Sequence, residues 1–146
     1  MNEVLFLCTG NYYRSRFAEC VFNHLAAARG MAWRATSRGL RVKPDGAVNV
    51  GPISGFTVAG LRDRQMAHEE PLRFPRQVSA EELQGAEVVV ALKEKEHRAM
   101  MESQFPEMAE RVRYWHVHDL DAAMPGEALA EIERLVGELV DEFSGM

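Results

Sequence analysis

The fold of this chain is decided close to its N-terminus by Val4-Leu5-Phe6-Leu7-Cys8-Thr9-Gly10-Asn11-Tyr12-Tyr13-Arg14-Ser15. The four leading residues form an apolar run with a β-branched and an aromatic member, which is typical of a strand buried on both faces. A cysteine follows directly, and an arginine and a serine close the stretch. A loop this short can wrap one tetrahedral oxyanion, so that its backbone N–H groups converge there. The stretch therefore predicts a first strand that runs into an anion-binding loop beside a thiol.

The residues of this loop suit a phosphate group held against a thiolate. A helix beginning at about Ser15 would direct its positive end at the anion, and the same field would stabilise a thiolate on Cys8. Arg14 can bind two phosphate oxygens with its planar guanidinium. Ser15 can hydrogen-bond the sulfur, Asn11 tolerates left-handed backbone and Gly10 permits tight curvature. We expect the whole loop to bind phosphate, through Thr9, Gly10, Asn11, Tyr12, Tyr13, Arg14 and Ser15.

Length and composition indicate one globular domain over residues 1–146, with 47% hydrophobic and 27% charged residues. No apolar run is long enough to span a bilayer, and the first residues lack the basic start of a signal peptide. We therefore expect a soluble cytoplasmic protein that does not bind membranes. The two cysteines, Cys8 and Cys20, are too few for a disulfide framework or for a zinc site of their own. Cys20 is expected on the inner stripe of the first helix.

The net charge of −5 hides a gradient along the chain. Residues 1–43 carry seven Lys or Arg against two Glu, whereas the chain from Asp119 onward carries eight acidic residues against one arginine. A positive field near Cys8 would attract a phosphorylated substrate. The basic residues are scattered and the protein is acidic as a whole, which argues against a nucleic-acid partner.

Strand and helix patterns alternate along the chain, which favours an α/β fold with a parallel sheet. We expect a three-layer α/β/α sandwich with about four parallel strands and its ligand site at their carboxyl ends. The strands are expected over residues 3–7, 33–37, 87–92 and 112–117. The helices are expected over residues 15–28, 54–64, 93–104 and from about 126 onward, with a short capped helix beginning at 79.

The loop at residues 8–15 matches Cys-x-Gly-Asn-x-x-Arg-Ser, and with it the chain resembles the low-molecular-weight protein tyrosine phosphatases, of the branch shared with bacterial arsenate reductases. The similarity covers nearly the whole chain and continues in residues 17–19, 36–40, 76–78, 88–92 and 115–119. It implies the flavodoxin-like fold of these phosphatases, a monomer or weak dimer, and no metal or other cofactor.

The resemblance also implies hydrolysis of phosphorylated proteins or small phosphomonoesters in two steps, through a phosphocysteine. Cys8 would attack, Arg14 would bind the transferring group, and an aspartate would protonate the leaving oxygen and then activate water. This aspartate belongs to an Asp-Pro motif, which falls here on Asp119-Leu120. Asp119 keeps the family's spacing from Trp115, and Asp121 is the rival. Specificity for phosphotyrosine follows from the family name alone.

The chain departs from the family pattern around the loop. Tyr13 stands where many members carry a second cysteine, and Tyr12 where a smaller apolar residue is common. Arg16 replaces a common proline and adds positive charge next to the site. The aromatic residue that often follows the Asp-Pro pair is replaced by Asp121-Ala122.

Three other interpretations remain open. His116 and His118 share one face of a predicted strand and could suggest a metal site. Arsenate reduction with an external thiol would need only Cys8, whereas an internal relay needs two further cysteines near residues 65–90, which the sequence lacks. A module that binds phosphate without catalysis is the third.

Overall fold

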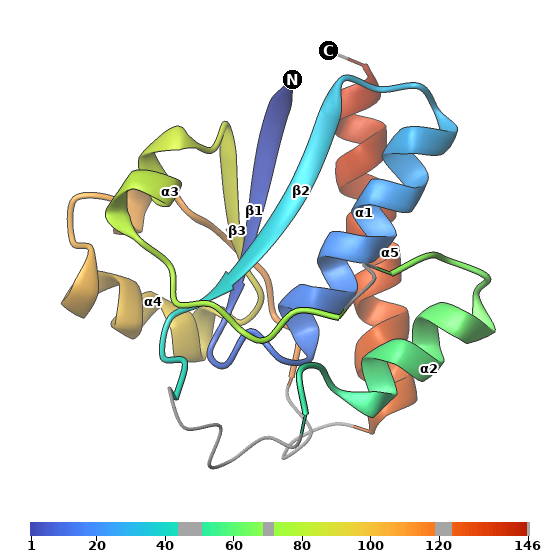
Figure 1. The fold of residues 1–146 in the computed structure, drawn as a ribbon. Coiled ribbons are helices and arrows are strands. Elements are labelled where there is room, and N and C mark those ends of the chain that lie inside the picture. The colour runs from blue at the N-terminus through green and yellow to red at the C-terminus, as the bar shows by residue number, and fades with distance from the viewer. Residues whose placement is uncertain (44–50, 69–71, 119–123, 146) are drawn as a thin grey trace.

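The computed structural model describes residues 1–43, 51–68, 72–118 and 124–145, and a parallel sheet lies at its centre (Figure 1). The four strands are β1 (Asn2–Cys8), β2 (Trp33–Gly39), β3 (Val88–Ala91) and β4 (Arg113–Tyr114). They lie in the order β2-β1-β3-β4, and every pair is parallel. The α/β fold class predicted from the sequence is therefore confirmed.

Helices cover both faces of this sheet (Figure 1). One side carries α1 (Arg14–Ala28), α2 (Gly55–Asp63) and α5 (Pro125–Ser144), and α2 packs against both α1 and α5. The other side carries α3 (Ala80–Gly85) and α4 (Glu94–Gln104), followed by the 3-10 turn η1 (Ala109–Arg111). The expected capping box at the start of α3 is present, because Ser79 and Glu82 hydrogen-bond each other's backbone N–H.

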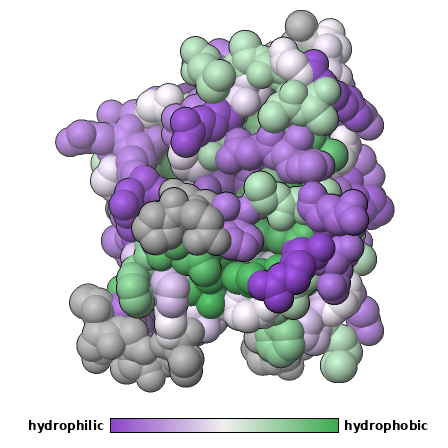
Figure 2. All heavy atoms as spheres, turned by 45° about the vertical axis from the view of Figure 1, so that its right-hand side comes forward, coloured by the Kyte–Doolittle hydropathy of each residue, from purple (hydrophilic) through white to green (hydrophobic). Residues whose placement is uncertain are grey.

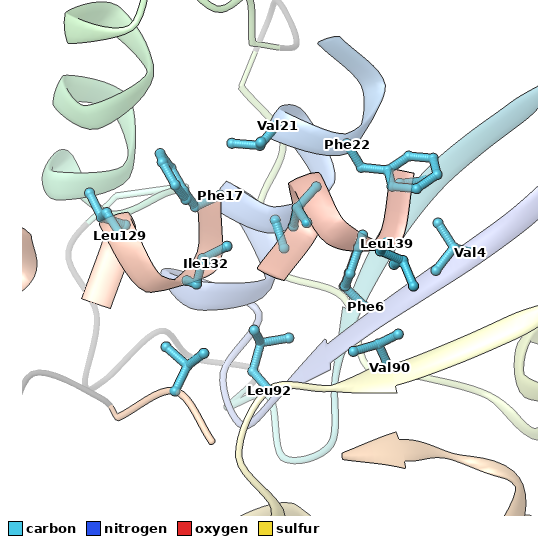
Figure 3. Close-up of a cluster of buried hydrophobic side chains, with 14 of the residues drawn as sticks. Val4, Phe6, Phe17, Val21, Phe22, Val90, Leu92, Leu129, Ile132 and Leu139 are labelled. Carbon is cyan, nitrogen blue, oxygen red and sulfur yellow. The ribbon is translucent and has the colours of Figure 1, made fainter. Parts of the chain in front are cut away.

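The apolar run of β1 supplies both halves of the core. Val4 and Phe6 pack with α1 and α5, whereas Leu5 and Leu7 pack with α3 and α4. Figure 3 shows the first cluster, in which Phe6 lies close to side chains from neighbouring strands and helices. Burying each such side chain stabilises the fold by about 1.5–3 kcal/mol. This two-sided burial explains why the strand is continuously apolar.

The strands bring their carboxyl ends to one edge of the sheet. Cys8, the last residue of β1, pairs with Gly39, the last residue of β2. A Cβ atom at Gly39 would lie 2.8 Å from the carbonyl oxygen of Thr9, so only glycine allows this close approach to the loop. The loop at residues 8–15 therefore begins at the edge where α/β proteins bind their ligands.

Two local predictions need correction. The strand expected over residues 112–117 is shorter as β4, although Trp115 and Val117 still donate backbone hydrogen bonds to Ala91 and Leu92, at 2.8 and 2.7 Å. Cys20 is half-buried rather than fully inside, because it packs at the margin of the first cluster.

The surface over α1, α2 and α5 is mostly hydrophilic, and hydrophobic side chains reach it near the middle of the face shown in Figure 2. Within the described ranges, no helix has both the length and the apolar character needed to cross a membrane.

Candidate active site

The loop between β1 and α1 directs its carbonyl groups at the surrounding protein. Five of these oxygens accept a hydrogen bond from outside the loop or from the helix that follows it. The donors are Leu40 N to Cys8 O (2.9 Å), Arg41 N to Thr9 O (2.9 Å), Arg16 Nη1 to Asn11 O (3.3 Å), Ser54 N to Tyr12 O (3.0 Å) and Thr57 Oγ1 to Tyr13 O (3.1 Å). Because the C=O and N–H of a trans peptide point in opposite directions, this arrangement favours amide hydrogens facing the inside of the loop.

The thiol of Cys8 lies next to the hydroxyl group of Ser15. The Sγ–Oγ distance is 2.9 Å, and both residues are buried. Asn11 Nδ2 donates to the same hydroxyl oxygen at 2.9 Å. The Ser15 oxygen is then an acceptor toward Asn11, so its own hydrogen is available to the sulfur. A hydroxyl that donates to sulfur stabilises the thiolate form.

Asn11 organises the loop through its backbone and its side chain. Its φ of 51° lies in the left-handed region, which asparagine tolerates better than most residues. Besides Ser15, the side-chain amide donates to Ser37 Oγ at 3.0 Å. The side-chain oxygen accepts from Arg73 Nη1 at 3.0 Å and from the backbone N–H of Arg76 at 3.1 Å. This side chain therefore connects three segments of the protein.

A second layer of polar residues supports Asn11. Arg73 Nη2 donates to Ser37 Oγ at 3.0 Å and to Glu19 Oε1 at 3.2 Å. Ser37 Oγ in turn donates to Glu19 Oε1 at 2.6 Å. The sequence analysis missed Glu19 and Arg73 as supporting residues, although Glu19 and Ser37 fall in segments that resemble the phosphatase family.

Arg16 has a structural role that the sequence did not reveal. We expected it to add charge next to the site, but its side chain is only 3% exposed. The guanidinium donates to three backbone carbonyls, those of Asn11, Pro52 and Arg73, at 3.3, 3.0 and 2.9 Å. It therefore holds two neighbouring segments against the phosphate loop.

Replacing Arg16 with methionine should destabilise the protein by about 2–4 kcal/mol, because three carbonyl acceptors lose a charged donor. Urea unfolding followed by circular dichroism measures this loss. Arg62→Met removes an exposed arginine from α2 and serves as the control, with a change within about 0.5 kcal/mol. Equal stability of the two variants would contradict the structural role of Arg16.

The arginine of the loop is held from two sides. Arg14 is 2% exposed, and its Nη1 donates to the carbonyl of Val117 at 3.1 Å. Its Nη2 donates to Glu96 Oε1, also at 3.1 Å. The hydroxyl of Thr9 donates to the same carboxylate oxygen. These contacts fix the plane of the guanidinium beside the loop.

Glu96 is kept ionised by its neighbours. His97 Nδ1 accepts the backbone N–H of Lys93 at 3.0 Å, so a neutral ring carries its hydrogen on Nε2, 3.4 Å from Glu96 Oε1. The hydrogen bond from His97, together with those from Thr9 and Arg14, holds the pKa of Glu96 well below its ordinary value and outweighs the effect of burial. The sequence analysis treated this segment only as a charged helix and missed both residues.

Glu96→Gln should lower kcat/KM for a phosphate ester about tenfold, because Arg14 loses its charged acceptor. At pH 7 the variant should also be less stable by about 1–2 kcal/mol. Because the pKa of Glu96 is lowered in the folded protein, the wild type has its full stability advantage over Glu96→Gln above the ordinary carboxyl pKa of 4.5. This stability difference becomes smaller as the pH falls below that value. Urea unfolding at pH 7 and pH 3 measures the trend.

The matched control is Glu94→Gln, two residues earlier on α4, where the carboxylate pairs with the half-exposed Arg98. It should leave kcat/KM unchanged. A stability difference between wild type and Glu96→Gln that grows toward pH 3 would contradict the assigned role of the carboxylate.

The other candidate residues are two exposed histidines and two aspartates beyond the described ranges. Asp119 and Asp121 both lie outside the described residues. His116 and His118 are exposed. Among the described residues, no three His, Cys, Asp or Glu side chains are grouped so that they could hold a metal ion. Cys8 and Cys20 are not joined in a disulfide.

A parallel α/β sheet whose first strand runs into a Cys-x5-Arg loop defines a class of phosphate-binding proteins with a cysteine at the anion site. Within that class, the chain belongs to the low molecular weight phosphotyrosine protein phosphatase family, whose model matches residues 3–134. The resemblance inferred from the sequence is therefore confirmed.

Solved structures of similar proteins share the fold. A low molecular weight protein tyrosine phosphatase from T. tengcongensis has a TM-score of 0.80 at 26% identity, over 97% of this chain and 99% of that one. YfkJ from Bacillus subtilis has a TM-score of 0.84 at 24% identity, over 99% and 96%. The YwlE arginine phosphatase from Geobacillus stearothermophilus has a TM-score of 0.77 at 19% identity, over 99% and 94%. No curated protein matches the chain in sequence.

Proposed function

We propose that residues 1–146 act as one phosphatase domain that hydrolyses phosphomonoesters through a phosphocysteine. The observation that carries this proposal is the Cys8 thiol, 2.9 Å from the Ser15 hydroxyl, at the start of a loop whose carbonyls are bonded outward. In the first step the Cys8 thiolate attacks phosphorus, an S–P bond forms, and the P–O bond to the leaving group breaks. In the second step water displaces the thiolate and releases inorganic phosphate.

Arg14 and the loop amides stabilise the charge on the transferring group. The Nη1 and Nη2 atoms of Arg14 donate to Val117 and Glu96, and these contacts hold the plane of the guanidinium beside the loop. A planar guanidinium carries five N–H donors and can bind two phosphoryl oxygens at once. Such donors act most strongly on charge that develops in the transition state.

Asp119 donates the proton to the leaving oxygen and then activates water. Val117, two residues earlier, has its carbonyl on Arg14 at 3.1 Å. The described chain thus contacts Arg14 two residues before Asp119, which supports this choice. Asp121 is the rival for the same role.

Asp119→Asn should slow esters with poor leaving groups by about 100-fold, because they depend on the proton. Esters with good leaving groups, such as p-nitrophenyl phosphate, should slow much less. Rates for a series of aryl phosphates of increasing leaving-group pKa measure this difference. If the rate depends more steeply on the leaving-group pKa in Asp121→Asn than in Asp119→Asn, Asp121 is the proton donor.

The function is tested with purified protein in the presence of a chelator. Phosphate release from p-nitrophenyl phosphate and phosphotyrosine peptides supports the proposal. Phosphoarginine belongs in the same assay, because two of the structures with this fold are described as arginine phosphatases. Thiol-dependent reduction of arsenate without release of phosphate from any ester would replace the proposal by the reductase alternative.

A further inference from the structure

A cavity of about 390 Å³ lies beside the outer side of α1, away from the phosphate loop. Its wall includes Glu19, Cys20 and Ala27 from α1, together with Arg34 from β2 and Ala67 from the segment after α2. None of residues 8–15 lines it. The volume is in the range of pockets that bind small molecules.

One wall of this cavity carries an available hydrogen-bond acceptor. Both donors to Glu19, the hydroxyl of Ser37 and the guanidinium of Arg73, bond to Oε1. Within the described part of the chain, Oε2 receives no hydrogen bond. Asn23, another wall residue, is already occupied by the backbone N–H and C=O of Ala35, at 2.8 and 3.1 Å. A ligand would therefore meet a carboxylate oxygen that lacks a donor.

The rest of the wall indicates what else such a ligand would carry. Arg34 is exposed and contributes a cation, and Ala27 and Ala67 contribute apolar surface. The imidazole rings of His24 and His68 complete the wall. A compact ammonium group suits one free carboxylate oxygen better than a planar guanidinium does. We propose that this cavity is a regulatory site for a small primary amine, with its ammonium group on Glu19. A carboxylate on the same molecule would pair with Arg34.

Glu19 connects this cavity with the nucleophile. Glu19 Oε1 accepts from Ser37 Oγ at 2.6 Å, and Ser37 Oγ accepts from Asn11 Nδ2 at 3.0 Å. The same Asn11 amide donates to Ser15 Oγ at 2.9 Å, and Ser15 Oγ lies 2.9 Å from Cys8 Sγ. An ammonium group on Glu19 weakens the carboxylate as an acceptor for Ser37, which changes the hydrogen bonding around the sulfur. The regulatory effect rests on the proposed function of Cys8.

The test uses L-lysine and n-butylamine as probes, and binding is first established on the wild-type protein because Cys20 lines the cavity. Cys8 reactivity is then measured in a Cys20→Ser variant, whose only thiol is Cys8, after this variant is shown to bind the probes as the wild type does. Binding is measured by NMR, through the side-chain amide signals of Asn23. The reactivity of Cys8 is measured as its alkylation rate with iodoacetamide, which needs no substrate turnover. We expect millimolar lysine to change this rate about fivefold, as for a typical coupling between two sites. If the protein hydrolyses no phosphate ester but lysine still changes the alkylation rate of Cys8, only the proposed function is overturned.

Three substitutions and one control locate the site. Ala27→Trp fills the cavity and should abolish binding, whereas Ala28→Trp, on the exposed neighbouring residue, should keep it. Glu19→Gln should abolish binding of both probes. Arg34→Met should weaken lysine and leave n-butylamine unchanged. Binding that survives Ala27→Trp, or no binding of either probe to the wild-type protein, would overturn the site. Binding without any change in Cys8 alkylation would overturn the regulation.

Discussion

Cys8→Ser is expected to lower phosphate-ester turnover by at least about 1,000-fold, as loss of a nucleophile does in other enzymes. The hydroxyl group of serine ionises far less readily than a thiol, so the attacking anion is almost absent near neutral pH. The replacement is nearly the same size, and the loop carbonyls keep their hydrogen bonds because none of them involves the sulfur. The loss should therefore be chemical rather than structural.

Steady-state kinetics on p-nitrophenyl phosphate measures this effect, together with phosphate binding by calorimetry. The variant should still bind inorganic phosphate, since Arg14 and the loop amides remain. Turnover that persists undiminished in Cys8→Ser would eliminate the phosphocysteine mechanism. Loss of phosphate binding together with turnover would show that the substitution disrupts the loop.

Arg14→Lys should lower kcat/KM by about 100- to 1,000-fold, the usual cost of removing a donor to a transition-state oxyanion. Arg14 donates to Val117 and Glu96 at once, and in the proposed mechanism its planar guanidinium also binds phosphate. A lysine ammonium cannot satisfy three acceptors lying in different directions with the same geometry. The carboxylate of Glu96 would then compete with phosphate for a single cation.

The effect is measured as kcat/KM and as the Kd of inorganic phosphate, which should rise. Arg62→Lys makes the same replacement at an exposed position on α2 and should change neither quantity. Full activity in Arg14→Lys would show that the loop amides alone bind the transferring group.

The main elements of the fold were predictable because their signals are local. The apolar run at residues 4–7 predicts a strand covered on both faces, and the structure buries it on both. The stripe from Leu129 to Phe143 predicts α5, which spans Pro125–Ser144. The end of β4 was predicted less well, since pairing with β3 continues only as isolated backbone hydrogen bonds.

The candidate site was predictable only where its residues are neighbours in the chain. Cys8, Asn11 and Ser15 lie within one loop, so their type and spacing indicate an anion site without further information. Glu96, the carboxylate partner of Arg14, is 82 residues away in the sequence. Arg73, which supports Asn11, is 62 residues away from it. Nothing in the local pattern marks Glu96 or Arg73 as members of this site.

The sequence by itself determined the α/β fold and the position of the Cys-x5-Arg loop after the first strand, and it led to the prediction of which residues face an anion. These features follow from hydrophobic periodicity and short-range spacing, which are properties of the sequence and do not depend on tertiary contacts. Only the tertiary structure decided that Glu96 accepts a hydrogen bond from Arg14 and that the buried Arg16 donates to three backbone carbonyls. It also decided that Glu19 connects the cavity beside α1 to Cys8 through hydrogen bonds. Such contacts depend on which distant segments the packed sheet and helices bring within hydrogen-bonding distance.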